Sequence, residues 1–188
     1  MAVSIQTTRV KQLLTRLVHA GTVATVLLAA TVTEGLMAET KQPAGLRYGK
    51  AVGQFHDVHH YAAIYQLSVP RRTGARHLEL AVGALDNGGD TSAFLSLGPV
   101  WRFRPGTHSL YLEFGFSPTL ISDPSLGGEQ LGGNVHFTSS ATVGTRFGSR
   151  DEYGVELRIQ HTSNGGLDST NPGLDAIALN FNAQIWSM

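Results

Sequence analysis

The sequence predicts an all-β fold, an eight-stranded antiparallel transmembrane β-barrel of the outer membrane, and three observations support this prediction. From about Arg47 onward, apolar residues recur with a period of two, which is typical of strands. Only 15% of the 188 residues are charged and 22 are Gly, so the chain has little charge for the surface of a soluble domain. Short turns alternate with longer loops between the strands, as they do in outer-membrane barrels.

The N-terminal segment has the pattern of a secretory signal peptide. Three basic residues precede an apolar segment, 17–30, and small residues lead to Ala38. We expect cleavage after Ala38 and a single barrel domain over 39–188. A membrane anchor is the alternative, but polar residues such as Glu34 interrupt the apolar run. Without residues 1–38 the chain keeps 11 basic and 13 acidic residues, a net charge of −2, so we expect no nucleic-acid partner.

Eight strand-like segments follow in order, each bounded by clusters of Gly, Pro, Asn or Asp. They span residues 45–54, 59–69, 76–86, 92–104, 108–120, 133–147, 152–163 and 175–186. The connections differ in length: they are short at 70–75, 105–107 and 148–151, intermediate at 87–90, and long at 122–132 and 164–174. No internal repeat or linker divides these segments, which indicates one domain.

Alternation within the strands separates an apolar face from a polar face. The apolar faces include Leu95, Leu97, Trp101, Leu112, Phe114, Val155, Leu157, Ile177 and Leu179, and the polar faces include Glu113, Glu156, Arg158, Asn180 and Asn182. A soluble barrel would show the same alternation with the apolar face inside, so an exported lipocalin-like lipid carrier is the main alternative. Strands of about 11 to 13 residues suit a tilted crossing of the bilayer, and the polar faces suit a packed lumen, which favours the membrane barrel.

Three polar residues lie on the apolar face near the end of the chain. His161 and Ser163 are two residues apart on a strand, so both side chains leave the same face, with Cα atoms about 6.5–7 Å apart. Asp175 opens the last strand on that face, and a hairpin centred near Asp168 brings it beside His161. Polar groups are expensive on a lipid-facing surface unless they lie at the interface or serve a function. A hydroxyl, an imidazole and a carboxylate in this order are the groups of a nucleophile, a base and an orienting residue.

A His-x-Ser pair also occurs by chance, and an interfacial pair could face lipid headgroups. A non-enzymatic outer-membrane barrel, structural or adhesive, would use the same strands. Such a barrel has no reason to place Ser163, His161 and Asp175 together on its apolar face, so the coincidence favours a catalytic site.

Segment 161–166 reads H-x-S-N-x-G, and Asn171-Pro172-Gly173 and an acidic residue follow it. With these motifs, the C-terminal third of the chain resembles the PagL-type lipid A 3-O-deacylases of Gram-negative outer membranes. The resemblance implies that Ser163 is the nucleophile, that His161 is the general base and that Asp175 orients it, where the family usually has Glu. It also implies that Asn164 and the backbone N–H of Gly166 stabilise the oxyanion.

The reaction that this resemblance implies is hydrolysis of the 3-hydroxyacyl chain ester-linked at position 3 of lipid A. Ser163 would attack the ester carbonyl, and water would release the acyl-enzyme. The resemblance implies no cofactor. The expected partners are lipid A, as part of lipopolysaccharide, and the outer membrane, and a homodimer is left open.

One further polar cluster raises the alternative of a metal site. It contains His56, His59 and His60 with Asp57, near the first external loop. An exposed polar cluster in a loop needs no special function, so we predict no metal here. The absence of Cys excludes a thiolate ligand and a Cys nucleophile.

Overall fold

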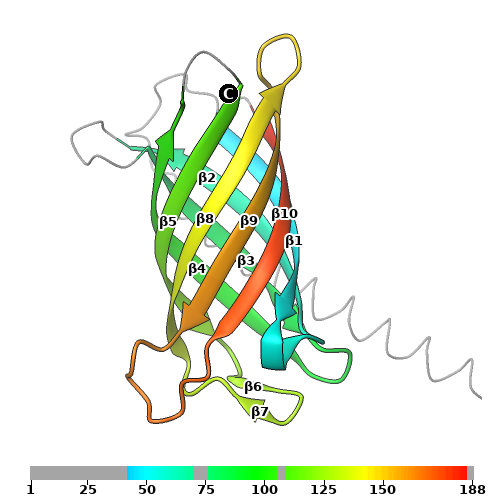
Figure 1. The fold of residues 1–188 in the computed structure, drawn as a ribbon, viewed down its shortest axis with the longest axis vertical. Coiled ribbons are helices and arrows are strands. Elements are labelled where there is room, and N and C mark those ends of the chain that lie inside the picture. The colour runs from blue at the N-terminus through cyan, green and yellow to red at the C-terminus, as the bar shows by residue number, and fades with distance from the viewer. Residues whose placement is uncertain (1–41, 70–75, 106–108, 186–188) are drawn as a thin grey trace, which may run out of the picture. The chain divides into compact units, whose positions relative to one another are not determined.

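The computed structural model describes residues 42–69, 76–105 and 109–185, and its main element is a closed barrel of eight long strands (Figure 1). The strands are β1 (Gln42–Val52), β2 (His59–Ser68), β3 (His77–Asp86), β4 (Thr91–Phe103), β5 (Leu110–Ile121), β8 (Val135–Phe147), β9 (Tyr153–Ser163) and β10 (Leu174–Ile185). All of them pair antiparallel, so the predicted fold class is confirmed. The expected signal peptide, residues 1–38, lies outside the described residues. No helix in the described part of the chain is long and apolar enough to span a membrane.

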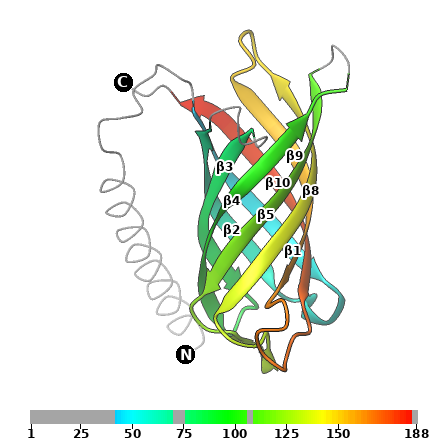
Figure 2. The same ribbon diagram turned by 90° about the vertical axis from the view of Figure 1, so that its left-hand side faces the viewer.

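The strands are ordered β1-β10-β9-β8-β5-β4-β3-β2, so every long strand pairs with its neighbours along the chain and β1 closes the barrel against β10. In this closing pair Gln42 lies opposite Ile185, and Val52 lies opposite Asp175. Figure 2 shows that the strands are tilted relative to the barrel axis, as closure of a sheet requires.

The strands match the predicted segments closely, and the differences lie in the connections. The first strand ends at Val52 because Gly53 adopts a φ of +76° and begins a short 3-10 helix, η1 (Gly53–Phe55). The long connection between β5 and β8 contains a small hairpin that the sequence did not predict, formed by β6 (Ser125–Leu126) and β7 (Glu129–Gln130). This hairpin, η1 and the β9–β10 connection lie at the same end of the barrel (Figure 1), which we call the loop end.

The two faces of the barrel wall have opposite chemistry. The outer wall exposes large apolar side chains, including Leu97, Phe114, Leu157, Ile159, Leu179 and Phe181. The lumen side buries mostly polar and charged ones, including Arg47, Glu79, Glu113, Glu156, Arg158 and Asn182. This is the distribution of a transmembrane barrel and the reverse of a lipocalin-like barrel, whose interior is apolar.

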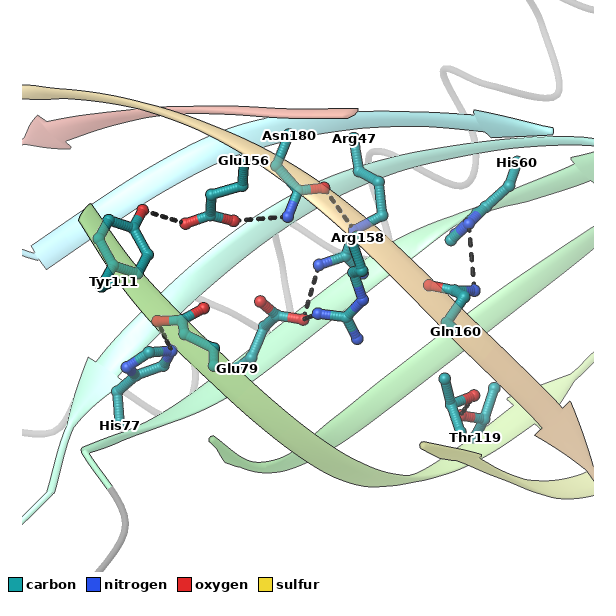
Figure 3. Close-up of polar contacts among 12 residues, drawn as sticks. Arg47, His60, His77, Glu79, Tyr111, Thr119, Glu156, Arg158, Gln160 and Asn180 are labelled. Atoms are coloured by element: carbon teal, nitrogen blue, oxygen red, sulfur yellow. Dashed lines mark hydrogen bonds and ion pairs between the residues drawn. The ribbon is translucent and has the colours of Figure 1, made fainter. Parts of the chain in front are cut away.

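Ion pairs fill the middle of the lumen (Figure 3). The buried carboxylate of Glu79 on β3 lies 2.7 Å from Nη2 of Arg47 on β1 and 3.0 Å from Nη1 of Arg158 on β9. No two of the strands β1, β3 and β9 are neighbours in the barrel, so the contacts cross the lumen. Because water does not surround these charges, each depends on the others for its stability.

A second group of contacts extends this network along the lumen. Glu156 accepts a hydrogen bond from the Tyr111 hydroxyl at 2.6 Å and another from Nδ2 of Asn180 at 2.7 Å (Figure 3). Arg102 donates to Glu113 farther along the barrel. The interior is therefore a packed polar core that ties opposite walls together.

We predict that Glu79→Gln destabilises the barrel, because it leaves two buried guanidinium groups without their shared carboxylate. The expected loss is about 3–5 kcal/mol in the free energy of unfolding, the usual effect of removing one partner of a buried ion pair. Urea unfolding of the protein refolded into lipid vesicles measures it. Glu129→Gln, at an exposed position of β7, is the control and should leave the unfolding midpoint unchanged.

Candidate active site

The β9–β10 hairpin brings His161 and Asp175 side by side on the outer wall at the loop end. The register pairs the two residues directly, and Nδ1 of His161 lies 2.8 Å from Oδ1 of Asp175. Ser163 lies two residues beyond His161 on the same face and is half-buried. A hairpin between the last two strands predicts this pairing of His161 with Asp175.

The ring of His161 is oriented for proton transfer. A carboxylate at Nδ1 favours the tautomer with the proton on Nδ1, which leaves Nε2 as the acceptor that a general base needs. The His161 side chain is 49% exposed, and no described residue forms a hydrogen bond with Nε2. This nitrogen is therefore open to a substrate or to Ser163.

The hydroxyl of Ser163 forms no hydrogen bond with the described residues, so a contact with Nε2 of His161 is not made in this structure. Side-chain rotation can bring the two groups together, because residues two apart on a strand have Cα atoms only about 6.5–7 Å apart. Catalytic hydrogen bonds of this kind are often long without substrate and shorten in the complex.

Gly173 lies close to the imidazole of His161. Its φ is +72°, and a Cβ at this position would lie 2.7 Å from Cε1 of His161. The Asn171-Pro172-Gly173 motif therefore ends at a position where only Gly fits against the ring. The Asp175 carboxylate therefore orients the His161 ring, and Gly173 leaves space for it.

The structure assigns the side chain of Asn164 to contacts within the loops. It is completely buried, and its Nδ2 donates to the carbonyl oxygens of Gly132, at 3.0 Å, and Thr170, at 2.7 Å. Its Oδ1 accepts the N–H of Gly166 at 2.9 Å, and its own N–H donates to Oδ1 of Asn171 at 3.0 Å. Asn164 thus connects the β5–β8 loop to the β9–β10 loop.

This geometry differs from the expected oxyanion site. The donors expected there, Asn164 and the N–H of Gly166, are already bonded to protein acceptors. An oxyanion role for either group requires these bonds to be exchanged, whereas the role visible in the structure is to order the loop. The sequence carried a signal for it, since Asn followed by Gly-Gly is typical of a turn closed by the Asn side chain.

An aromatic groove of about 300 Å³, which the sequence analysis missed, opens on the outer wall beside Ser163. It is lined by Phe116, Phe137, Ser139, His161, Ser163 and Gly165. The rings of Phe116 on β5 and Phe137 on β8 stack with centroids 5.8 Å apart and planes 12° apart. Aromatic walls next to a serine hydroxyl suit an apolar chain attached to a reactive carbonyl.

The three histidines near the first loop do not converge. His56 pairs with Asp57 at the surface, His59 bonds to a tyrosine on the outer wall, and His60 points into the lumen toward Gln160. Within the described ranges, no group of three side chains of metal-ligating type is close enough to hold a metal ion.

Most of the described chain matches one known protein family. Residues 57–184 match the family model described as lipid A 3-O-deacylase (PagL). The chain belongs to the PagL family. The match runs from just before β2 to the penultimate residue of β10 and includes the positions of Ser163, His161 and Asp175.

Two curated relatives are named lipid A deacylase PagL. The Bordetella bronchiseptica protein is 30% identical over 86 residues, which are 46% of this chain and 47% of the relative. The Pseudomonas aeruginosa protein is 30% identical over 97 residues, which are 49% of this chain and 55% of the relative. The matched regions thus span about half the length of each relative.

The fold of this PagL-family chain is also similar to a solved structure. The crystal structure of the outer membrane enzyme PagL matches it with a TM-score of 0.61, over 76% of this chain and 99% of the other. The two sequences are 21% identical, so this likeness concerns the fold.

We predict that Gly173→Ala lowers ester hydrolysis at least tenfold, because the new Cβ displaces the His161 ring and small misplacements of catalytic groups cost up to about a hundredfold in rate. Hydrolysis of a lipid ester in detergent measures it. Gly133→Ala is the matched control, since Gly133 has the same φ of +72° but no neighbour within 4 Å of the added Cβ. Equal losses in both variants would mean that backbone strain alone explains the effect.

Proposed function

We propose that this protein is an outer-membrane serine esterase that hydrolyses the 3-hydroxyacyl chain ester-linked at position 3 of lipid A. The observation that carries the proposal is the position of Ser163, His161 and Asp175 on a lipid-facing wall, next to an aromatic groove. Membership of the lipid A 3-O-deacylase family supports the same substrate.

In the proposed mechanism, the Oγ of Ser163 attacks the ester carbonyl while Nε2 of His161 takes its proton. Asp175, bonded to Nδ1, stabilises the imidazolium that forms. Collapse of the tetrahedral intermediate breaks the bond to the sugar oxygen, which receives the proton from His161. Water, deprotonated by His161, then hydrolyses the acyl-enzyme and releases the 3-hydroxy fatty acid and free Ser163.

The oxyanion of the intermediate needs hydrogen-bond donors close to Ser163. We propose that Asn164 and the N–H of Gly166 supply them, and that substrate binding exchanges part of their present bonding. Breaking the Gly166 N–H bond to Oδ1 of Asn164 frees the Gly166 donor. A donor from Asn164 requires exchange of one of its Nδ2 bonds, to the carbonyl oxygen of Gly132 or of Thr170.

The proposed location follows from the barrel itself. An apolar outer wall suits the hydrocarbon core of a bilayer, and export would depend on residues 1–38 as a cleaved signal peptide. Long loops of such barrels face outward, so the loop end and Ser163 would lie at the outer leaflet, where lipid A is. One copy of the chain supplies all three catalytic groups, so the chemistry does not require a homodimer.

Ser163→Ala tests the nucleophile. We expect the barrel to fold, because one half-buried hydroxyl without a hydrogen bond is lost, and we expect removal of the 3-hydroxyacyl chain to stop. Mass spectrometry of lipid A from cells that express each variant measures the loss of this chain. Thr162→Ser is the adjacent control, since Thr162 is buried on the lumen side. Activity above about a tenth of wild type in Ser163→Ala would assign the nucleophile to another residue.

Asp175→Asn tests the orienting carboxylate. The amide keeps the size of the side chain but loses the charge that stabilises the imidazolium, so we expect kcat to fall by about 10²–10⁴. Asp175→Glu, which introduces the residue usual in the family, should remain active because the position is exposed and has room for one more methylene. Wild-type kinetics in Asp175→Asn would leave Ser163 and His161 as a dyad.

A further inference from the structure

The charges at the loop end are distributed unevenly. Among the described residues, Lys50 is the only Lys or Arg on the outer wall or in the loops of this end. The acidic residues there are Asp57, Asp86, Asp90, Asp123, Glu129, Asp168 and Asp175. The other described cations point into the lumen or lie at the opposite end of the barrel. Lys50 is thus a single cation among acidic residues at this end of the barrel.

Closure of the barrel puts Lys50 near the proposed active site. Strand β1 pairs with β10 so that Lys50 lies opposite Ile177 and Val52 lies opposite Asp175. Lys50 is therefore a diagonal neighbour of Asp175, at about 7–8 Å. Its Cα lies about 12 Å from that of His161, given two interstrand spacings and two residues along the strand.

The side chain of Lys50 is exposed and forms no ion pair or hydrogen bond with the described residues. Its ammonium group is thus available to an external anion. Here the cation is single and lies next to the catalytic hairpin, which points to a bound ligand.

An aromatic surface adjoins Lys50 on β1 and β2. The Tyr48 hydroxyl lies 2.9 Å from Nδ1 of His59, and the rings of Tyr48 and Tyr61 have centroids 5.3 Å apart. Lys50 pairs directly with His59 in the register, so the cation lies at the loop-side edge of these rings. Partly exposed aromatic rings beside a cation suit the flat face of a sugar that carries a phosphate.

The two binding features lie on opposite sides of the catalytic residues. The aromatic groove is formed on β5 and β8, whereas Lys50 and its neighbouring rings lie on β1 and β2, beyond β10. A lipid whose ester lies at Ser163 can place its acyl chain in the groove and its headgroup toward Lys50. Across the wall, the groove, Ser163 and Lys50 follow one another in the same order as the acyl chain, the ester and the headgroup of such a lipid.

We infer that Lys50, supported by Tyr48, His59 and Tyr61, binds the phosphorylated sugar headgroup of the lipid that Ser163 attacks. This inference rests on the proposed function and assigns part of its substrate specificity. The proposed ligand is a sugar phosphate, and the alternative ligand is the phosphate of a glycerophospholipid.

Binding to Ser163→Ala protein in detergent micelles tests the inference, because this protein cannot consume the substrate. The probes are lipid A, lipid A from which the phosphates have been removed, and phosphatidylglycerol. With Lys50 present we expect lipid A to bind about fivefold more tightly than its dephosphorylated form, as one charge-assisted contact at an interface would give. Lys50→Met should bring this ratio to about one, and Lys50→Arg should restore it.

Arg104→Met is the matched control, since Arg104 is an exposed cation at the opposite end of the barrel, and it should keep the ratio. An unchanged ratio in Lys50→Met, or equal binding of phosphatidylglycerol and lipid A, would overturn the inference. Hydrolysis is measured separately, by mass spectrometry of lipid A treated with protein that retains Ser163. Absence of hydrolysis there, with the binding ratio intact, would contradict the proposed function and leave headgroup binding standing.

Discussion

Closure of the sheet between β1 and β10 is the constraint on which the rest of the structure depends. In hydrocarbon every backbone N–H and C=O must be bonded within the protein, and a closed antiparallel barrel leaves no strand edge unpaired. Closing eight strands leaves a narrow lumen, which is filled by side chains such as Glu79 and the two Arg residues that it joins. The outer wall is then available only to apolar residues, apart from the positions that serve a function.

The proposed active site depends on this closed wall for its rigidity. His161 bonds to a carboxylate that the β9–β10 ladder places directly opposite it, and Gly173, just before β10, leaves space for the ring. Asn164 connects the loop after Ser163 to the β5–β8 loop through buried hydrogen bonds. Ser163 therefore lies on a regular strand, while the loop next to it is ordered by a single buried amide, that of Asn164.

The site faces outward, and this has a consequence for access. A substrate in the outer leaflet would reach Ser163 by lateral diffusion along the wall, with no passage through the barrel. The groove on β5 and β8 and the cation on β1 lie on either side of the site, so substrate orientation would be set by the wall itself. The lumen can then serve stability alone, with its ion pairs separated from the chemistry.

The amino-acid sequence by itself determined the local features. A period of two identified all eight long strands to within a few residues, and it placed His161 and Ser163 on one face, because the direction of a side chain on a strand depends only on the position along that strand. A hairpin register was enough to bring Asp175 beside His161. The chemical roles proposed for these residues come from the resemblance of the motif to the PagL family.

Only the tertiary structure decided the contacts between distant segments. The stacked rings of Phe116 and Phe137, the hydrogen bond from Asn164 to Gly132, and the approach of Lys50 to Asp175 all join segments that lie far apart in the sequence. Such contacts depend on the closed strand order and on the register of each pair. Periodicity within one strand carries no information about the offset of its partners, so these parts of the site became visible only once the barrel was closed.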